Sequence, residues 1–239
     1  MRAGRPHHTG DGYSRKGMIL LGCLAVASFK MTLDESKKPW FPDDVADPRL
    51  GPFFPVKSRG YLPHLYRDGA SYFVTFCLAD VADGKKAARS RRYSSDGPDE
   101  IAESFEPALS TGECLLGDSA LAGVVETALL HFQRERYGVS AWCVMPNHVH
   151  VVVTPFVHFT LGKILHSWKS FTAHMINKKL GRQGPVWQEE SFDHVIRNVD
   201  EFRKFVTYTE MNPVVAGLAD RPEQWSLSSA RWKVKPQPE

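Results

Sequence analysis

The segment AWCVMPNHVHVVV (141–153) constrains the fold of this chain more than any other part of it. Two runs rich in apolar and β-branched residues, 141–145 and 148–153, are separated only by Pro146 and Asn147. Runs of this kind are typical of buried strands, and so short a connection joins strands that are close in space. The segment therefore predicts two neighbouring strands of one sheet.

The rest of the chain predicts one further clear strand and three helices. The run SYFVTFCL (71–78) is rich in aromatic and β-branched residues, as buried strands are. Apolar residues recur at helical spacing over 121–132. A second helix is predicted between a Thr160 cap and Gly181, and Asn198, with a glutamate three residues later, starts a third.

The order of these elements indicates the fold class. Residues 186–197 are a mixed strand or loop, and the helix that follows is expected to stop or kink at Pro213. Strand, helix, two close strands, helix, extended segment and helix together favour an α+β fold. We expect a ferredoxin-like antiparallel sheet with helices packed on one face.

The 239 residues suffice for one well-buried domain with extensions or for two small domains. Residues 1–50 show no sustained period and are expected to be poorly ordered, and 80–118 form an insertion or long loop. The run MILLGCLAVASF (18–29) resembles a short signal-peptide core but is too short to span a bilayer. We interpret it as a loose appendage or as the product of a misassigned start codon, and expect no membrane association.

The four cysteines (Cys23, Cys77, Cys114 and Cys143) show no CxxC spacing and lie mostly in apolar runs. This usage indicates reduced, buried thiols rather than a disulfide framework. We therefore expect a cytoplasmic protein.

Charge is distributed unevenly along the chain. The net charge is +3, which only weakly favours an anionic partner. Between Glu135 and Glu189, however, no Asp or Glu occurs, while six basic residues do: Arg136, Lys163, Lys169, Lys178, Lys179 and Arg182. This segment is either a phosphate-attracting surface or a solvated basic helix face, and charge alone does not decide between them.

The pair His148 and His150 is the first candidate for chemistry. Residues two apart on a strand point to the same face, so both imidazoles would reach one divalent ion, while Val149, Val151 and Val153 face the other way into the core. The HxHxH motif of the histidine-triad hydrolases is excluded because residue 152 is Val. Taken alone, an HxH sequence is common and is more often structural than metal-binding.

The second candidate is Tyr208 with Asn212. Residues four apart share a face of a helix, which would present a phenol and an amide oxygen together. A tyrosine attacks phosphorus only when a cation or a base assists it. The alternative is a half-buried tyrosine that packs on the sheet, with Asn212 as a helix C-cap.

Five motifs occur along the chain in a characteristic order. They are LPHLYRDGASYFVTF (62–76), WCVMPNHVHVVV (142–153), SWKSFTAHMIN (167–177), VWQEESFDHVIR (186–197) and YTEMNPVVAGL (208–218). Through these motifs the chain resembles the REP-associated tyrosine transposases, within the HUH single-tyrosine transposase superfamily, over about residues 59–232. This sets the expected domains: an extension at 1–58, the catalytic domain with its 80–118 loop, and a tail at 233–239.

The resemblance implies roles for residues of both candidates. His148 and His150 match the two metal-binding histidines of the family. Tyr208 matches the single nucleophile on a C-terminal helix, and Asn212 matches the third metal ligand. The cofactor implied is Mg²⁺ or Mn²⁺, and the substrate is single-stranded DNA with a REP-like hairpin, cleaved and rejoined through a 5′-phosphotyrosine.

Further DNA contacts are expected from basic and aromatic side chains. Two other functions stay open: a DNA-binding regulator that does not cleave, and a metal-dependent phosphoesterase that uses water. Monomer and homodimer are both compatible with the sequence. The expected DNA-contacting residues are Lys169, Lys178, Lys179, Arg182, Trp187 and Arg197.

Overall fold

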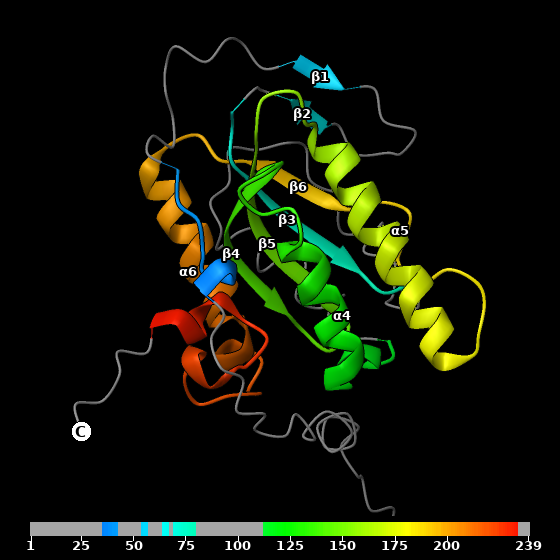
Figure 1. Cartoon of the computed structure of the whole chain (residues 1–239). Helices are drawn as coiled ribbons and strands as arrows, with labels where there is room; N and C mark the ends of the chain where they lie inside the picture. Colours follow the sequence, from blue (N-terminus) through cyan, green and yellow to red (C-terminus); the bar gives the residue numbers. More distant parts are fainter. Residues whose placement is uncertain (1–34, 43–53, 57–63, 67–68, 80–111, 234–239) are drawn as a thin grey trace, which may run out of the picture.

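An antiparallel sheet of four strands, in the order β4-β5-β3-β6, forms the centre of the structure (Figure 1). The computed structural model describes residues 35–42, 54–56, 64–66, 69–79 and 112–233. The strands of the sheet are β3 (Tyr72–Cys77), β4 (Tyr137–Val144), β5 (His148–Pro155) and β6 (Phe192–Val195). A separate pair is formed by β1 (Phe54–Val56) and β2 (His64–Tyr66).

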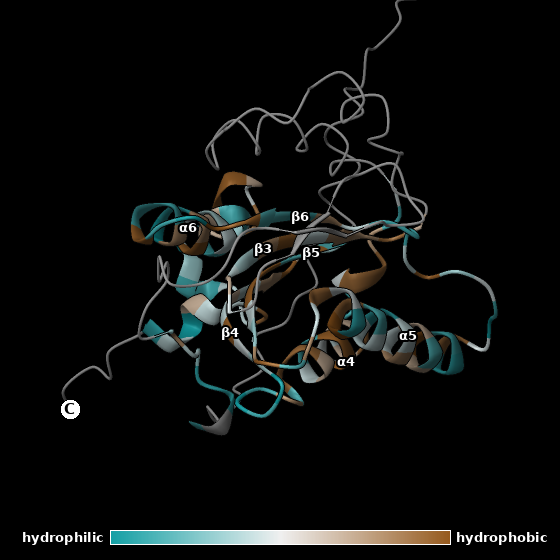
Figure 2. Cartoon of the chain, turned by 90° about the horizontal axis from the view of Figure 1, so that it is seen from above, coloured by the Kyte–Doolittle hydropathy of each residue, from teal (hydrophilic) through white to brown (hydrophobic). Residues whose placement is uncertain are grey.

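Three α-helices cover the two faces of the sheet. Helices α4 (Ser119–Leu130) and α5 (Leu161–Leu180) lie on one face, and α6 (Val199–Val215) lies on the other (Figure 2). The prediction of an α+β fold with an antiparallel, ferredoxin-like sheet is confirmed. The expectation that the helices pack on one face of the sheet is correct for α4 and α5, whereas α6 packs against the opposite face.

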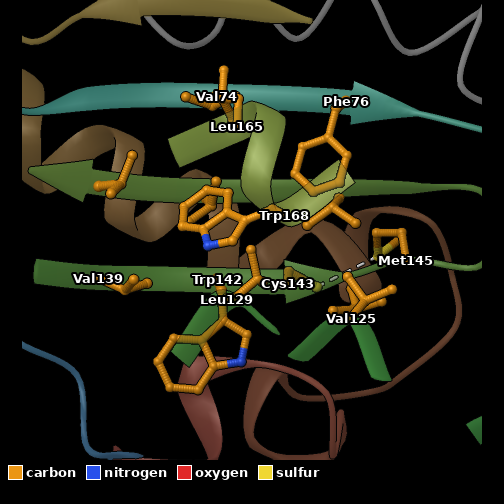
Figure 3. Close-up of a cluster of buried hydrophobic side chains, with 14 of the residues drawn as sticks. Val74, Phe76, Val125, Leu129, Val139, Trp142, Cys143, Met145, Leu165 and Trp168 are labelled. Atoms are coloured by element: carbon orange, nitrogen blue, oxygen red, sulfur yellow. Dashed lines mark hydrogen bonds between the residues drawn. The ribbon is translucent and has the colours of Figure 1, made fainter. Parts of the chain in front are cut away.

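The larger core lies between the sheet and helices α4 and α5. Val74 and Phe76 of β3 point toward α5, whose Trp168 and Leu165 fill this side (Figure 3). The Trp168 indole N–H donates to the buried Tyr137 hydroxyl at 2.9 Å, which satisfies a polar group inside the apolar cluster. A smaller cluster joins the other face of the sheet to α6 and consists of Phe73, Ala141, Val152, Ile196, Phe202, Phe205 and Val206.

The helix ends follow the local signals of the sequence. The Thr160 hydroxyl accepts from the Lys163 N–H, and Gly181 ends α5 in the left-handed conformation at φ 61°. The Asn198 side chain accepts from the Glu201 N–H at 2.8 Å and starts α6. The expectation that this helix stops at Pro213 is wrong, because α6 continues to Val215 with Pro213 inside it.

Part of the segment expected to be poorly ordered contacts the sheet. A 3-10 turn, η1 (Glu35–Lys37), precedes Trp40, whose N–H donates to the Val139 carbonyl at 2.8 Å. The Trp40 ring lies edge-on to Phe156 at 5.3 Å between centroids and covers Gly138. These residues therefore belong to the folded domain. The remaining expectations for 1–34, the loop over 80–111 and the tail from 234 lie outside the described residues.

Short 3-10 helices complete the described chain: η2 (Leu115–Gly117), η3 (Pro222–Gln224) and η4 (Ser229–Lys233). Within the described residues, no helix is both long and apolar enough to cross a membrane. Cys77, Cys114 and Cys143 are free thiols, and burial raises the pKa of Cys77 to about 12. Cys23 lies outside the described part.

Gly138 gives a test of the contact between Trp40 and the sheet. A Cβ at this position would overlap the Trp40 ring, so Gly138→Ala should lower the free energy of unfolding by about 1–3 kcal/mol in urea titrations. Gly123→Ala is the matched control, because nothing lies near its Cβ on α4 and helix propensity favours Ala by about 1 kcal/mol. A Gly138→Ala protein as stable as the parent would show that Trp40 does not occupy this position.

Candidate active site

Two imidazoles converge on the face of the sheet that α6 covers. β5 is paired on both sides, with β4 and with β3, so its alternate side chains have fixed directions. Val149 and Val151 enter the larger core, and His148 and His150 point the other way. Their Nε2 atoms are 3.0 Å apart, and both rings are buried.

The second nitrogen of each ring is held by a neighbouring side chain. His148 Nδ1 lies 2.7 Å from Oδ1 of Asn147, the last residue of the connection before β5. His150 Nδ1 lies 2.8 Å from Oγ1 of Thr75, its register partner on β3. These contacts at Nδ1 fix the orientation of both rings.

Burial keeps both imidazoles neutral. It lowers the pKa of His148 from 6.5 to about 3, against the opposing effect of a hydrogen bond to the Asn212 side chain. Burial and, secondarily, the adjacent His148 lower the pKa of His150 well below its usual range. A neutral imidazole is the form that binds a metal ion, so the environment selects that form.

Helix α6 brings Tyr208 and Asn212 to the histidines. The Tyr208 ring is half-buried and lies edge-on to His150, with 5.3 Å between centroids, and to Phe73 at 5.6 Å. Asn212, one turn later, is buried and hydrogen bonded to His148. The four residues singled out in the sequence thus meet on one face of the sheet.

The arrangement of donor atoms fits a divalent cation. Two nitrogens bound at about 2.1 Å and at right angles to each other would be about 3.0 Å apart, which matches the separation of the two Nε2 atoms. Asn212 adds an amide to the same place. Among the described residues, no three His, Cys, Asp or Glu side chains group in a way that could hold a metal. The available ligand set is therefore two imidazoles and an amide, which carries no charge.

Two of the expected DNA contacts are engaged inside the protein. Trp187 is buried beside Phe76 and donates to the Thr172 hydroxyl at 2.8 Å. This corrects its expected role in base stacking, since α5 covers the ring. The Lys169 ammonium donates to the Glu189 carbonyl at 2.8 Å and to the Ser191 hydroxyl at 3.2 Å. Through these hydrogen bonds Lys169 anchors the segment before β6, and burial lowers its pKa to about 8.

The other expected contacts are exposed but dispersed. Lys178, Lys179 and Arg182 lie at the C-terminal end of α5, and Arg197 follows β6. Helix α5 lies across the sheet from α6, so its basic end and Tyr208 belong to different layers of the molecule (Figures 1 and 2).

Three contributors to the site were not found from the sequence. Thr75 stands in an otherwise apolar strand, and its polarity was the only signal. In the sequence, Asn147 indicates only a short connection between two strands. Glu210 is buried on α6, accepts from the Ser229 hydroxyl at 2.9 Å and pairs with Lys233, which ties the helix to the C-terminal segment.

Comparison with known proteins places this geometry in context. The family model described as "Transposase IS200 like" matches residues 124–208, a range that includes both histidines and ends at the tyrosine. The REP-associated tyrosine transposase of Escherichia coli (strain K12) is 28% identical over 104 residues, 43% of this chain and 60% of that protein. The chain thus matches less than two thirds of that relative's length. The resemblance seen in the sequence is confirmed.

Two solved structures are also similar. A REP-associated tyrosine transposase bound to a REP hairpin is 22% identical, with a TM-score of 0.48 and coverage of 74% of this chain and 84% of that chain. A putative transposase from Deinococcus radiodurans is 12% identical, with a TM-score of 0.27 and coverage of 68% and 97%.

The buried neutral histidines predict a pH dependence of stability. The unfolded chain takes up a proton on His148 near pH 6.5 and the folded protein only near pH 3, so the free energy of unfolding decreases as pH falls between these values. In EDTA, His148→Gln should reduce the slope by up to about 1.4 kcal/mol per pH unit. Urea titrations between pH 6 and 4.5 measure this slope of the free energy of unfolding against pH. His166→Gln, which removes an exposed histidine, is the control, and equal slopes in the two variants would contradict the assignment.

Proposed function

We propose that this chain, a relative of the IS200-like transposases over residues 124–208, cleaves and rejoins single-stranded DNA at hairpin repeats. The observation that carries the proposal is the meeting of one tyrosine with a pair of neutral, convergent imidazoles on one face of the sheet. The name of the Escherichia coli relative, REP-associated tyrosine transposase, supports hairpin repeats as the substrate.

The reaction is a transesterification at phosphorus. The Tyr208 hydroxyl oxygen attacks, its proton is released, and the bond from phosphorus to the 3′ oxygen breaks. The products are a 5′-phosphotyrosine and a free 3′-OH. Because the phosphotyrosine keeps the phosphoester bond, a 3′-OH of another strand can reverse the step and join new ends without ATP.

The side chains around Tyr208 have separate tasks. His148 and His150 would hold a divalent cation, Mg²⁺ or Mn²⁺, with Asn212 as the third protein ligand. When bound, such an ion supplies positive charge that polarises the scissile phosphate. Phe73 packs edge-on against the phenol and limits the directions in which its oxygen can point.

DNA binding would use groups on both sides of the sheet. Lys178, Lys179 and Arg182 supply sequence-independent attraction for phosphates. Because they lie across the sheet from Tyr208, a substrate that contacts both must pass around an edge of the sheet. Phe192 of the edge strand β6 is half-buried and packs near Phe73 at 6.3 Å, and it would stack on an unpaired base of the substrate.

The central test is the nucleophile. The protein is incubated with a hairpin-bearing single strand and Mn²⁺, and an SDS-resistant adduct is sought on gels. Tyr208→Phe removes only the hydroxyl, so the adduct should vanish while folding and hairpin binding persist. EDTA should abolish the adduct of the parent protein.

Tyr137→Phe is the control for this test. Its hydroxyl is buried beside Trp168 on the other face of the sheet, so the adduct should still form in that variant. An adduct that survives Tyr208→Phe would place the nucleophile elsewhere. Cleavage without any adduct would instead support a phosphoesterase that uses water, and binding without cleavage would support a regulator.

The exposed basic residues of α5 give a second test. If Lys178 contacts a phosphate, Lys178→Ala should reduce the slope of log K against log salt by about 0.7 for a single strand. Fluorescence anisotropy at several salt concentrations measures it. Lys38→Ala, an exposed lysine of the N-terminal segment, serves as the control with equal charge loss. Equal slopes for the two variants would show that Lys178 is a solvated side chain that contacts no phosphate.

A further inference from the structure

The Nδ1 atoms of the two imidazoles face different kinds of group. His148 Nδ1 faces the Asn147 Oδ1 atom at 2.7 Å, and His150 Nδ1 faces the Thr75 hydroxyl at 2.8 Å. Both partners are buried. An amide oxygen only accepts a hydrogen bond, whereas a hydroxyl can donate or accept by rotating its proton.

These chemistries fix the protons of the ion-free site. Because Asn147 offers an acceptor, His148 carries its proton on Nδ1 and presents a lone pair at Nε2. The Nε2 atom of His150 faces that lone pair at 3.0 Å, so it carries the proton of His150. His150 Nδ1 is then unprotonated and accepts from the Thr75 hydroxyl.

The resulting chain of hydrogen bonds runs in one direction. The Thr75 hydroxyl donates to His150, Nε2 of His150 donates to His148, and Nδ1 of His148 donates to Asn147. All the distances, 2.8, 3.0 and 2.7 Å, fall in the range of ordinary hydrogen bonds. The two neutral rings thus satisfy one another while the site holds no ion, and the Asn212 side chain is a further hydrogen-bond partner of His148.

An ion bound between the rings requires a lone pair on both Nε2 atoms. His148 already presents one, but His150 must move its proton from Nε2 to Nδ1. In the new tautomer Nδ1–H needs an acceptor, and the Thr75 hydroxyl is the group that faces it at hydrogen-bonding distance in the described part of the chain. Without that hydroxyl the N–H would be buried and unsatisfied, which is costly.

We propose that Thr75 is a positioning residue that lets His150 exchange tautomers when a divalent ion binds, while Asn147 holds His148 in a single tautomer. This inference rests on the metal site of the proposed function and extends it. No net charge enters the buried site with the exchange, because one proton leaves Nε2 of His150 and one arrives at Nδ1 of the same ring. Positioning of this kind matches the general behaviour of groups behind metal-binding histidines.

The test compares two substitutions at one position. Thr75→Val keeps the shape and removes the hydroxyl, and Thr75→Ser keeps the hydroxyl. In calorimetric titrations of the full-length, DNA-free protein with Mn²⁺, Thr75→Val should weaken binding by about 10–100-fold, and Thr75→Ser should bind within a few-fold of the parent. Equal affinity of the Val variant and the parent would overturn the proposal.

A spectroscopic signature separates positioning from mere support of the fold. Ring ¹⁵N shifts of His150, recorded in EDTA and then with saturating Mg²⁺, should show the proton on Nε2 first and on Nδ1 afterwards, while His148 keeps its proton on Nδ1. An unchanged His150 tautomer would overturn the proposal, as would a parent protein that binds neither ion. Because no DNA is present, tautomer exchange without any later protein–DNA adduct would refute only the proposed cleavage.

Discussion

The two-residue alternation of β5 is the constraint on which the rest of the structure depends. This strand is paired on both sides, so each of its side chains is committed to one face. Val149 and Val151 complete the core beneath α4 and α5, and the same register turns His148 and His150 toward α6. A shift of one residue would exchange the two sets and destroy core and site together. The hydrophobic effect that folds the sheet therefore also places the histidines.

Burial of two imidazoles is unfavourable unless their nitrogens are satisfied. Here Thr75, Asn147 and Asn212 provide partners, and the rings bond to each other. The same burial lowers both pKa values and leaves the rings in the form that can bind an ion. Burial of the two imidazoles thus both costs free energy of folding and keeps the rings neutral, which is the form that binds an ion. A more exposed pair would be easier to accommodate, but protons would then compete with the ion for the ring nitrogens.

Features set by local sequence were predicted well, and features set by strand pairing were not. The capped start of α6 at Asn198 and the common direction of the two histidines depend on neighbours along the chain, and both are found in the structure. The role of Thr75 depends on its pairing with His150, which no periodicity reveals. The burial of Trp187 depends on the bridge between residues 78 and 187 and on the cover of α5.

In the proposed reaction, the separation of the basic residues from Tyr208 determines which interactions can act on the scissile phosphate. The exposed end of α5 and the tyrosine lie on opposite sides of the sheet. The sheet lies between them, with a spacing of about 10 Å to the helices on each side, whereas charges in water are screened over about 8 Å at physiological salt. In the proposed function, Lys178 and Arg182 would therefore attract DNA but contribute little to the stabilisation of charge at phosphorus. Stabilisation of that charge must come from groups on the α6 side. There the convergent Nε2 atoms of His148 and His150 would hold the cation of the proposed function, and such a cation would account for how an uncharged set of side chains assists attack by a phenol.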